Sequence, residues 1–450
     1  MSNDRPDATR DITRFAIETR LSDMPAEVRR EGIRSLVNIL GCTLGGARHD
    51  AVEKTWAALS PFAGREQVTL LGRSERTDAL TAALINTLAS SVYAFDDTHA
   101  EAIVHPSGPI MGATLAAGEL RGRSGADVLA AFISSIEVAC RLSKAISVAP
   151  AKGSIAWSQT GVVCGIGGAL ATARLLGLDI EQARMAMGIA AAEASGIRAV
   201  HGTHGTPMLP ANAGRAGLKA ACMAAAGVTS SATIIEARYG FAECFAEHPH
   251  LPHLTDGLGD RWEILGNTYK PYPCGIVIHP LIDAALEISR EASPSPEAIA
   301  KVEIRSSPAA MALCFRRHPK DEFEAQVSLY QWVAATLIRG QAGIPEGTDQ
   351  AIADPAIAAL RDRIQVETDP EIPHDGGDVT VTLADGRRFH RSIRNCIGNR
   401  GRPMTDGELD AKFLSAAQVL GARAADLLAS VRGIERVPDV AALCHAARVD

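Results

Sequence analysis

The sequence predicts a mainly α-helical protein with a smaller α+β part inserted before its C-terminal tail. Apolar residues recur at helical spacing through residues 1–260, with no convincing strand among them. Apolar and polar residues alternate only later, as at residues 300–306 and 378–383. Helical spacing returns at residues 405–429, and such a tail packs most simply on the first helices. We expect a large all-helical domain, residues 1–266 and 399–450, and a smaller α+β domain, residues 267–398.

The first part of the chain reads as a series of Ala- and Leu-rich helices. In the first series Ile33, Leu36, Val37 and Leu40 fall on one face of a helix. Small residues dominate residues 160–173, which predicts a buried helix packed closely against others; the glycines at 165–168 lie inside this helical pattern and do not form a nucleotide loop. The expected helices are residues 11–45, 77–93, 110–120, 125–146, 160–179, 180–194 and 211–226, followed by a short helix and turn at residues 230–244.

The residue pattern changes after Gly266, where residues 269–275 form a loop rich in Pro and Gly. Helices are expected at residues 279–291, 326–339 and 354–363. Strands are expected at residues 300–306, 364–368, 378–383 and 388–393, the last two joined by the hairpin turn Ala384-Asp385-Gly386. Alternation of helices with antiparallel strands indicates an α+β domain.

Composition excludes several classes of function. The 450 residues exceed one simple core. The net charge is 45 − 52 = −7 with no basic block, which argues against binding to nucleic acid or to an anionic membrane. No apolar run is long enough to span a membrane, and the polar start is not a signal peptide. Nine scattered Cys without zinc-site spacing fit reduced thiols, so we expect a cytoplasmic protein.

Titratable groups gather in one stretch, residues 94–108, with the sequence AFDDTHAEAIVHPSG. It holds Asp96, Asp97, Thr98, His99 and His105 between apolar helices. Such a cluster is expensive unless its groups are paired or used, so we interpret it as the floor of a small-molecule site. Plainer interpretations stay open: the carboxylates can cap a helix, and the second histidine can belong to a turn. A metal site would need convergent geometry that spacing alone cannot show.

Four segments together resemble the MmgE/PrpD family, which includes 2-methylcitrate dehydratase, cis-aconitate decarboxylase and iminodisuccinate epimerase. They are FDDTH with HPSG (residues 95–108), TGVVCGIGGALATARLLGLD (160–179), YKPYPCGIVIHPLIDA (269–284), and the pair VTVTLADGR and MTDGELDAKF. These segments occur in the family's order and span nearly the whole chain. The resemblance implies a helical domain with an α+β lid domain, a homodimer, a site between the domains, and no metal or organic cofactor.

The resemblance also implies a chemistry. Members abstract a proton next to a carboxylate of a small polyacid; loss of water, loss of carbon dioxide or return of the proton follows. The implied function is a cofactor-independent lyase acting on a small di- or tricarboxylic acid. Two alternatives stay open, an isomerase or epimerase that uses the same proton abstraction, and a non-catalytic homologue that binds a small acid.

Site residues carry over from the family position by position. His105 is expected as the acid/base, Asp96 and Asp97 as the catalytic acidic loop, and Lys270 as the cation that holds a carboxylate. The further expected substrate-binding residues are Thr98, His99, Ser158, His201, His204, Tyr272, His279 and Tyr330.

Four positions depart from the family pattern. Ser158 stands where a His is common, Leu209 where many members have a Lys, Ala94 where the decarboxylase-like members have an acid, and Gly275 where they have a lid-loop His. These losses remove an acid/base and a carboxylate anchor. We therefore do not expect this chain simply to repeat methylcitrate dehydration or aconitate decarboxylation, and we expect His201 and His204 to supply the missing polar groups.

Overall fold

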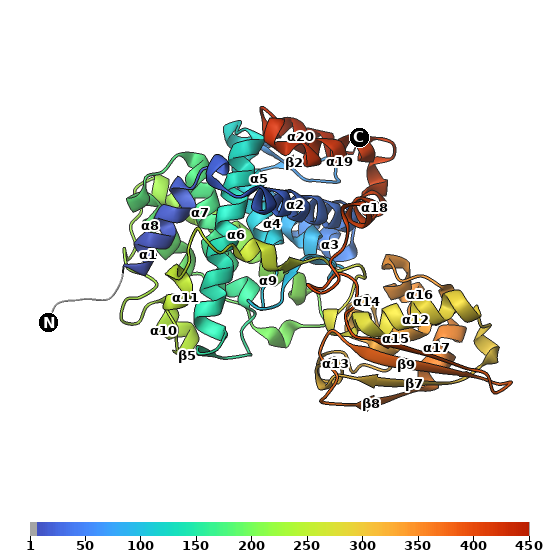
Figure 1. The fold of residues 1–450 in the computed structure, drawn as a ribbon. Coiled ribbons are helices and arrows are strands. Elements are labelled where there is room, and N and C mark those ends of the chain that lie inside the picture. Colours follow the sequence, from blue (N-terminus) through green and yellow to red (C-terminus); the bar gives the residue numbers. More distant parts are fainter. Residues whose placement is uncertain (1–6, 450) are drawn as a thin grey trace.

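A computed structural model describes residues 7–449 of the chain (Figure 1). Its first part is a bundle of helices joined by short loops. These helices are α1 (Ala8–Glu18), α2 (Ala26–Gly46), α3 (Asp50–Leu59), α4 (Ala79–Ser91), α5 (Ser107–Arg121), α6 (Gly125–Ser147), α7 (Gln159–Leu176), α8 (Ile180–Ala191), α9 (Gly205–Ala225), α10 (Phe241–Phe245) and α11 (Pro252–Thr255).

Helix α7 lies at the centre of this bundle and packs against α5, α6, α8 and α9. Its small residues allow the close approach: a Cβ added at Gly217 of α9 would lie 2.7 Å from the carbonyl oxygen of Gly165. Nearly all of α7 is buried. The prediction of a buried, tightly packed helix at this position is confirmed.

The prediction that the first 260 residues contain no strand is wrong. Five short strands occur there, too short for an alternating pattern to reveal them: β1 (Val68–Thr69), β2 (Arg76–Thr77), β3 (Thr98–His99), β4 (Lys152–Gly153) and β5 (Ala246–His248). The short helix and turn expected at residues 230–244 are found as a series of turns that ends in the short helix α10. Tyr239 adopts a left-handed φ of 59°, and Gly240 packs so closely on Ile234 that a Cβ would lie 2.6 Å from its carbonyl oxygen.

The later part of the chain folds around a four-stranded sheet with strand order β10-β9-β7-β8. The strands are β7 (Ile299–Ser306), β8 (Ile364–Thr368), β9 (Gly377–Leu383) and β10 (Arg388–Ile393); the helices are α12 (His279–Ala292), α13 (Pro308–Leu313), α14 (Glu322–Ala325), α15 (Leu329–Arg339), α16 (Asp349–Ala353) and α17 (Pro355–Asp362). Helix α12 packs on β9 and β10. Strands β7 and β8 pair in parallel, contrary to the antiparallel expectation, because the helices from α13 to α17 carry the chain back between them.

The C-terminal tail returns to the helical part beside α2 (Figure 1). It forms α18 (Asp406–Ala416), α19 (Arg423–Arg432) and α20 (Val440–Ala446). Tail residues such as Phe413 share one hydrophobic cluster with helices α1 to α9, and a second cluster holds apolar residues between Tyr272 and Cys396. The predicted fold class, mainly α with an α+β part, is confirmed, whereas the predicted boundaries at 266/267 and 398/399 stay a prediction.

No helix in residues 7–449 is both long and apolar enough to cross a membrane.

Candidate active site

The acidic stretch links the helical part of the molecule to the start of the α+β part. Strand β3 within it pairs with β6 (Asn267–Thr268), so that Thr98 lies opposite Thr268. The Thr268 hydroxyl also donates to the carbonyl oxygen of Thr98 at 2.6 Å. This short ladder brings the next residues, including Lys270, alongside the acidic loop.

The acidic stretch contains two strained backbone positions. Ala94 and Ile103 have φ values of 49° and 57°, in the left-handed region that residues with a Cβ avoid at a cost of roughly 1–2 kcal/mol each. At the first of them the carbonyl oxygen accepts a hydrogen bond of 2.9 Å from Lys270 Nζ. Surrounding contacts thus hold the loop in a shape that its own conformational preferences oppose, as is common at functional sites.

Asp97 belongs to the acidic stretch, and its side chain is fully buried. Its Oδ2 accepts hydrogen bonds from Ser107 Oγ at 2.8 Å and from Asn267 Nδ2 at 2.6 Å. Its Oδ1 has no partner among the described residues. Burial, together with the neighbouring charge of Asp96, raises the pKa of Asp97 to about 6, against the stabilising effect of the two donors.

The geometry of His105 defines its tautomer. Its Nδ1 lies 2.8 Å from the carbonyl oxygen of Asp97 and 3.1 Å from Thr98 Oγ1. Because a carbonyl oxygen can only accept, Nδ1 carries the proton and Nε2 carries the lone pair. Its backbone N–H donates to Thr160 Oγ1 at 2.9 Å, which fixes the residue against the first turn of α7. The ring is therefore oriented from both sides.

Burial lowers the pKa of His105 below its usual range; the charge of Asp96 opposes this shift, and the charge of Lys270 adds to it. The imidazole is consequently neutral near pH 7, with Nε2 able to accept a proton. A neutral, oriented imidazole is what a general base requires.

Lys270 is buried and already engaged by the protein. Besides the carbonyl oxygen of Ala94, its Nζ lies 3.7 Å from Asp96 Oδ1. Its charge thus compensates the acidic loop. The structure brings together Asp96, Asp97, Thr98, His105 and Lys270, as predicted from the sequence, while their roles with a substrate stay predictions.

Lys412 of α18 is a site neighbour that the sequence analysis missed. Its Nζ donates to Asn38 Oδ1 at 2.7 Å and to the carbonyl oxygens of Phe95 and Lys270 at 2.7 and 2.8 Å. Burial and the charge of Lys270 lower its pKa to about 8, although Cys42 acts in the opposite direction. The residue stands in the MTDGELDAKF segment, but nothing in the spacing shows that the tail reaches the acidic loop.

His279 lies at the start of α12, close enough to Lys270 to feel its charge. The ring is buried and stacks edge-on against Tyr272 at 5.3 Å. Burial and the Lys270 charge lower its pKa to about 3, so this histidine is neutral. Its Nε2 has no hydrogen-bond partner in the described part of the chain.

The other wall of the site is the segment that precedes α7 together with the loop at residues 195–204. Ser158 directly precedes α7, but its side chain does not cap the helix; its N–H donates to the carbonyl oxygen of Gly196 at 2.7 Å. Partial burial and the charges of Arg198 and His105 lower the pKa of His201, which places this histidine within electrostatic reach of His105. Arg198 was not identified from the sequence, where it is one arginine in an ordinary polar loop.

His99 and His204 contact groups outside this cluster. His99 is buried, accepts a hydrogen bond from the Ala102 N–H at 3.0 Å through Nδ1, and has its Nε2 3.2 Å from Glu263. His204 is exposed, with Nε2 3.8 Å from Asp50 and its ring 5.0 Å from that of Phe323. Their predicted binding of substrate stays a prediction that none of these contacts supports.

Tyr272 and Tyr330 also bond within the α+β part. The Tyr272 hydroxyl donates to Asp283 Oδ1 at 2.5 Å, and the guanidinium of Arg317 lies 4.1 Å from the centre of the Tyr330 ring. Their expected contact with substrate stays a prediction.

The departure at Gly275 has a steric reason. A Cβ added there would lie 2.7 Å from Cys314 Sγ, so the family's lid-loop histidine does not fit this backbone without movement of its neighbours.

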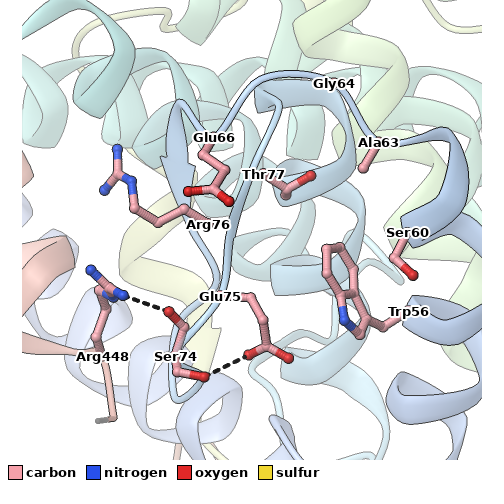
Figure 2. Close-up of a pocket in the computed structure, with 10 residues that line it drawn as sticks. All are labelled: Trp56, Ser60, Ala63, Gly64, Glu66, Ser74, Glu75, Arg76, Thr77 and Arg448. Carbon is pink, nitrogen blue, oxygen red and sulfur yellow. Dashed lines mark hydrogen bonds between the residues drawn. The ribbon is translucent and has the colours of Figure 1, made fainter.

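The residues of 7–449 contain no group of three or more His, Cys, Asp or Glu side chains that could hold a metal ion. A separate hollow of about 340 Å³ lies near β1 and β2 (Figure 2). Arg448 donates to the Ser74 carbonyl there, and none of the lining residues belongs to the predicted site. This hollow is therefore distinct from the cluster around His105.

Comparison with known families identifies the chain's relatives. A model of the MmgE/PrpD N-terminal domain matches residues 10–253, more than half of the chain, and a model of the C-terminal domain matches residues 272–434. The chain belongs to the MmgE/PrpD family.

Curated members of the MmgE/PrpD family align over most of the chain. Cis-aconitate decarboxylase of Mus musculus is 25% identical over 438 residues, covering 92% of this chain and 88% of its own length. The enzyme of that name from Aspergillus terreus is 25% identical over 474 residues, with coverages of 98% and 96%. The Homo sapiens one is 27% identical over 383 residues, with coverages of 80% and 78%. These relatives are enzymes, and they support an enzymatic role for this MmgE/PrpD chain.

Proposed function

We propose that the protein is a lyase that acts on a small di- or tricarboxylic acid by abstracting a proton next to a carboxylate, without an organic cofactor. The observation that carries the proposal is the hydrogen bond from His105 Nδ1 to the Asp97 carbonyl oxygen, which leaves Nε2 as the basic nitrogen. The similarity to cis-aconitate decarboxylases supports a small polycarboxylate as the substrate class.

In the first step, Nε2 of His105 takes the proton of a C–H bond adjacent to a carboxylate. The electron pair of that bond moves toward the carboxylate and forms an enolate-like intermediate, while the imidazole becomes an imidazolium. The Asp97 carbonyl oxygen keeps the Nδ1 proton in place throughout, so the ring neither rotates nor changes tautomer. The buried carboxylate of Asp96 stabilises the imidazolium that forms.

Two outcomes complete a lyase reaction. In dehydration, the electron pair forms a double bond as the neighbouring C–O bond breaks, and the leaving hydroxide takes the proton of the imidazolium and departs as water, which leaves His105 neutral again. In decarboxylation, the imidazolium first returns its proton to another carbon of the delocalised intermediate; the C–C bond to a carboxylate then breaks, carbon dioxide leaves, and the carbanion formed by that cleavage takes a proton from water.

An isomerase or epimerase is the second candidate. It would use the same first step, after which a proton returns to the other face of the carbon. Ser158 and Leu209 favour this candidate, because the wall that commonly carries a His and a Lys in the family has changed here. We expect the altered groups on that wall to affect which step follows proton abstraction.

The test is proton exchange in deuterated water. The purified protein is incubated with a panel of di- and tricarboxylates that includes cis-aconitate and citrate, and NMR follows deuterium incorporation and new products. We expect exchange at a carbon next to a carboxylate, together with release of water or carbon dioxide. His105→Asn keeps a donor near the Asp97 carbonyl but removes the base, and should lower the rate by about 10²–10⁴-fold.

His248→Asn is the matched control, because His248 is an exposed histidine with 70% of its side chain accessible. Exchange without elimination would point to the isomerase. Turnover of the His105→Asn protein at the wild-type rate would exclude the assigned role of His105. A wild-type protein that exchanges no proton of any of these acids would favour a non-catalytic binding protein.

A further inference from the structure

The guanidinium of Arg198 has no hydrogen-bond or ion-pair partner among the described residues, 7–449. The residue begins the short 3-10 turn Arg198–Val200. Its Nε is buried and unsatisfied. Burial alone lowers the pKa of Arg198, and no nearby carboxylate counteracts that effect. Only Nε is buried without a partner, so the two terminal nitrogens of this partly buried guanidinium are open to solvent or to a ligand, and a bound anion would offset the cost of its burial.

The backbone fixes Arg198 beside His105. The Arg198 N–H donates to the carbonyl oxygen of Ala156 at 3.0 Å, and the Ser158 N–H donates to that of Gly196 at 2.7 Å. This pairing attaches the loop to the residues that lead into α7. The first turn of α7 is in turn bonded to the backbone of His105 through Thr160. The charge of Arg198 reaches His105 and lowers its pKa.

A second buried polar group points to a ligand on the same wall. Gln159, the first residue of α7, is 4% exposed, and its Oε1 has no partner in the described part of the chain. The other cations near the site are occupied: Lys270 and Lys412 bond to protein oxygens, and Arg316 of the α+β part lies 3.5 Å from Glu324. The site therefore offers one cation without a protein partner, which suits a carboxylate, next to an unsatisfied amide acceptor, which suits a hydroxyl group of the same ligand.

We propose that Arg198 binds a carboxylate of the substrate and that the site thereby selects acids with at least two carboxylates. The inference rests on the proposed function, since one carboxylate must activate the C–H bond near His105 and a second one pairs with the guanidinium. Arginine suits this role because its planar fork can donate two parallel hydrogen bonds to a carboxylate.

The test measures binding, separately from turnover. Isothermal titration calorimetry is performed with succinate and citrate as probes and with butyrate as the monocarboxylate comparison, on the full-length wild type and on Arg198→Gln. We expect the di- and tricarboxylates to bind about 10–100-fold more weakly to the variant, as for a lost hydrogen bond to a charged group, whereas butyrate affinity stays within twofold. Arg198→Lys should restore part of the loss.

Arg215→Gln removes an exposed arginine of α9 and serves as the matched control, with wild-type affinities expected. Wild-type affinity of Arg198→Gln for succinate and citrate would overturn the inference, and so would a wild type that binds neither probe. Proton exchange by a wild type whose polycarboxylate affinity does not depend on Arg198 would sustain the proposed function and overturn this inference. Binding that depends on Arg198, without any exchange, would do the reverse.

Discussion

The floor and the far wall of the candidate site differ in how their polar groups are satisfied. On the floor, His105 Nδ1, Lys270 Nζ and one oxygen of Asp97 are bonded to the protein, and only the other oxygen of Asp97 among these groups lacks a partner in the described residues. On the wall, Arg198 Nε and Gln159 Oε1 have no partners among residues 7–449. Groups that hold one another are suited to positioning, whereas unsatisfied groups are suited to receiving a ligand. We therefore expect floor substitutions to alter chemistry and stability, and wall substitutions to alter the choice of ligand.

The largest expected effect separates kcat from KM. His105→Asn on the floor should lower kcat by about 10²–10⁴-fold with little change in KM, because it removes a group that acts in the transition state. Arg198→Gln on the wall should raise KM for a dicarboxylate by at least about tenfold with a smaller change in kcat. Steady-state kinetics on whichever acid the exchange assay identifies measures both constants. Equal losses of kcat in the two variants would contradict the division.

Lys412→Met tests whether the floor depends on its internal bonds. The substitution removes the donor shared by Asn38 Oδ1 and the carbonyl oxygens of Phe95 and Lys270, so each of them loses a hydrogen bond, and the Phe95 carbonyl keeps only its contact with Cys42 Sγ at 3.2 Å. We expect the free energy of unfolding to fall by about 3 kcal/mol. Chemical denaturation followed by circular dichroism measures the loss. Lys152→Met, at an exposed lysine of β4, is the control and should change stability by less than about 0.5 kcal/mol.

The raised pKa of Asp97 makes the floor sensitive to pH. Between about pH 4 and 6 the folded protein binds more protons at this carboxyl than the unfolded chain does, because its pKa is about 6 in place of 3.8. Stability contributed by this group therefore falls as pH rises through that window. Relative to wild type, Asp97→Asn should gain up to about 3 kcal/mol of unfolding free energy from pH 4 to 7. Parallel stability curves for the two proteins would contradict the assignment.

The pH profile of activity tests whether the charge of Arg198 on the wall affects the pKa of His105 on the floor. Since the pKa of His105 is lowered, kcat/KM should fall with acidification only below about pH 6.5, the usual histidine value, as the base becomes protonated. The positive charge of Arg198 contributes to this shift. Arg198→Gln should therefore move the acidic limb to higher pH. If the acidic limb stays at the same pH in Arg198→Gln, the charge of Arg198 does not influence the pKa of His105.

The smallest expected effect concerns Ser158. Its side chain makes no capping bond to α7, so Ser158→Ala should change the free energy of unfolding by less than about 0.5 kcal/mol. Asp78→Ala is a fitting comparison, because Asp78 Oδ1 accepts from the N–H groups of Leu80 and Thr81 at the start of α4. Loss of that cap should cost about 1 kcal/mol in the same denaturation experiment. A larger cost at Ser158 would reveal a structural role for the wall.

Local sequence patterns predicted the helices and strands that are marked by the spacing of their apolar residues. Helices such as α7 and strands such as β9 declare themselves through the period of their apolar residues. The two-residue strands β3 and β6 could not be predicted, because their pairing joins segments that lie 170 residues apart. That ladder brings Lys270 to the acidic loop, and only the resemblance to a family, not the spacing, anticipated that these residues share a site.

The residues that the sequence analysis missed share a physical reason. Lys412 lies on a tail helix with ordinary amphipathic spacing, and its importance comes from three oxygens supplied by distant segments. Arg198 is significant because its side chain lacks a partner, a property that a sequence does not express. Conversely, His99 stood out as a candidate by its position in the acidic stretch, yet the fold pairs it with Glu263.

During translation, Lys412 is made long after the acidic loop that it binds. It follows Phe95, whose carbonyl oxygen it binds, by 317 residues. At translation rates of about 5–20 residues per second, roughly 15–60 s separate the emergence of the acidic loop from that of its last bond donor. The preceding helices can pack during this interval, but the carbonyl oxygens of Phe95 and Lys270 still lack the donor that they share, Lys412 Nζ. A chain whose synthesis has not yet reached Lys412 thus has His105 but lacks the donor that bonds to the carbonyl oxygens of Phe95 and Lys270, and the arrangement around the acidic loop is complete only after Lys412 has been made.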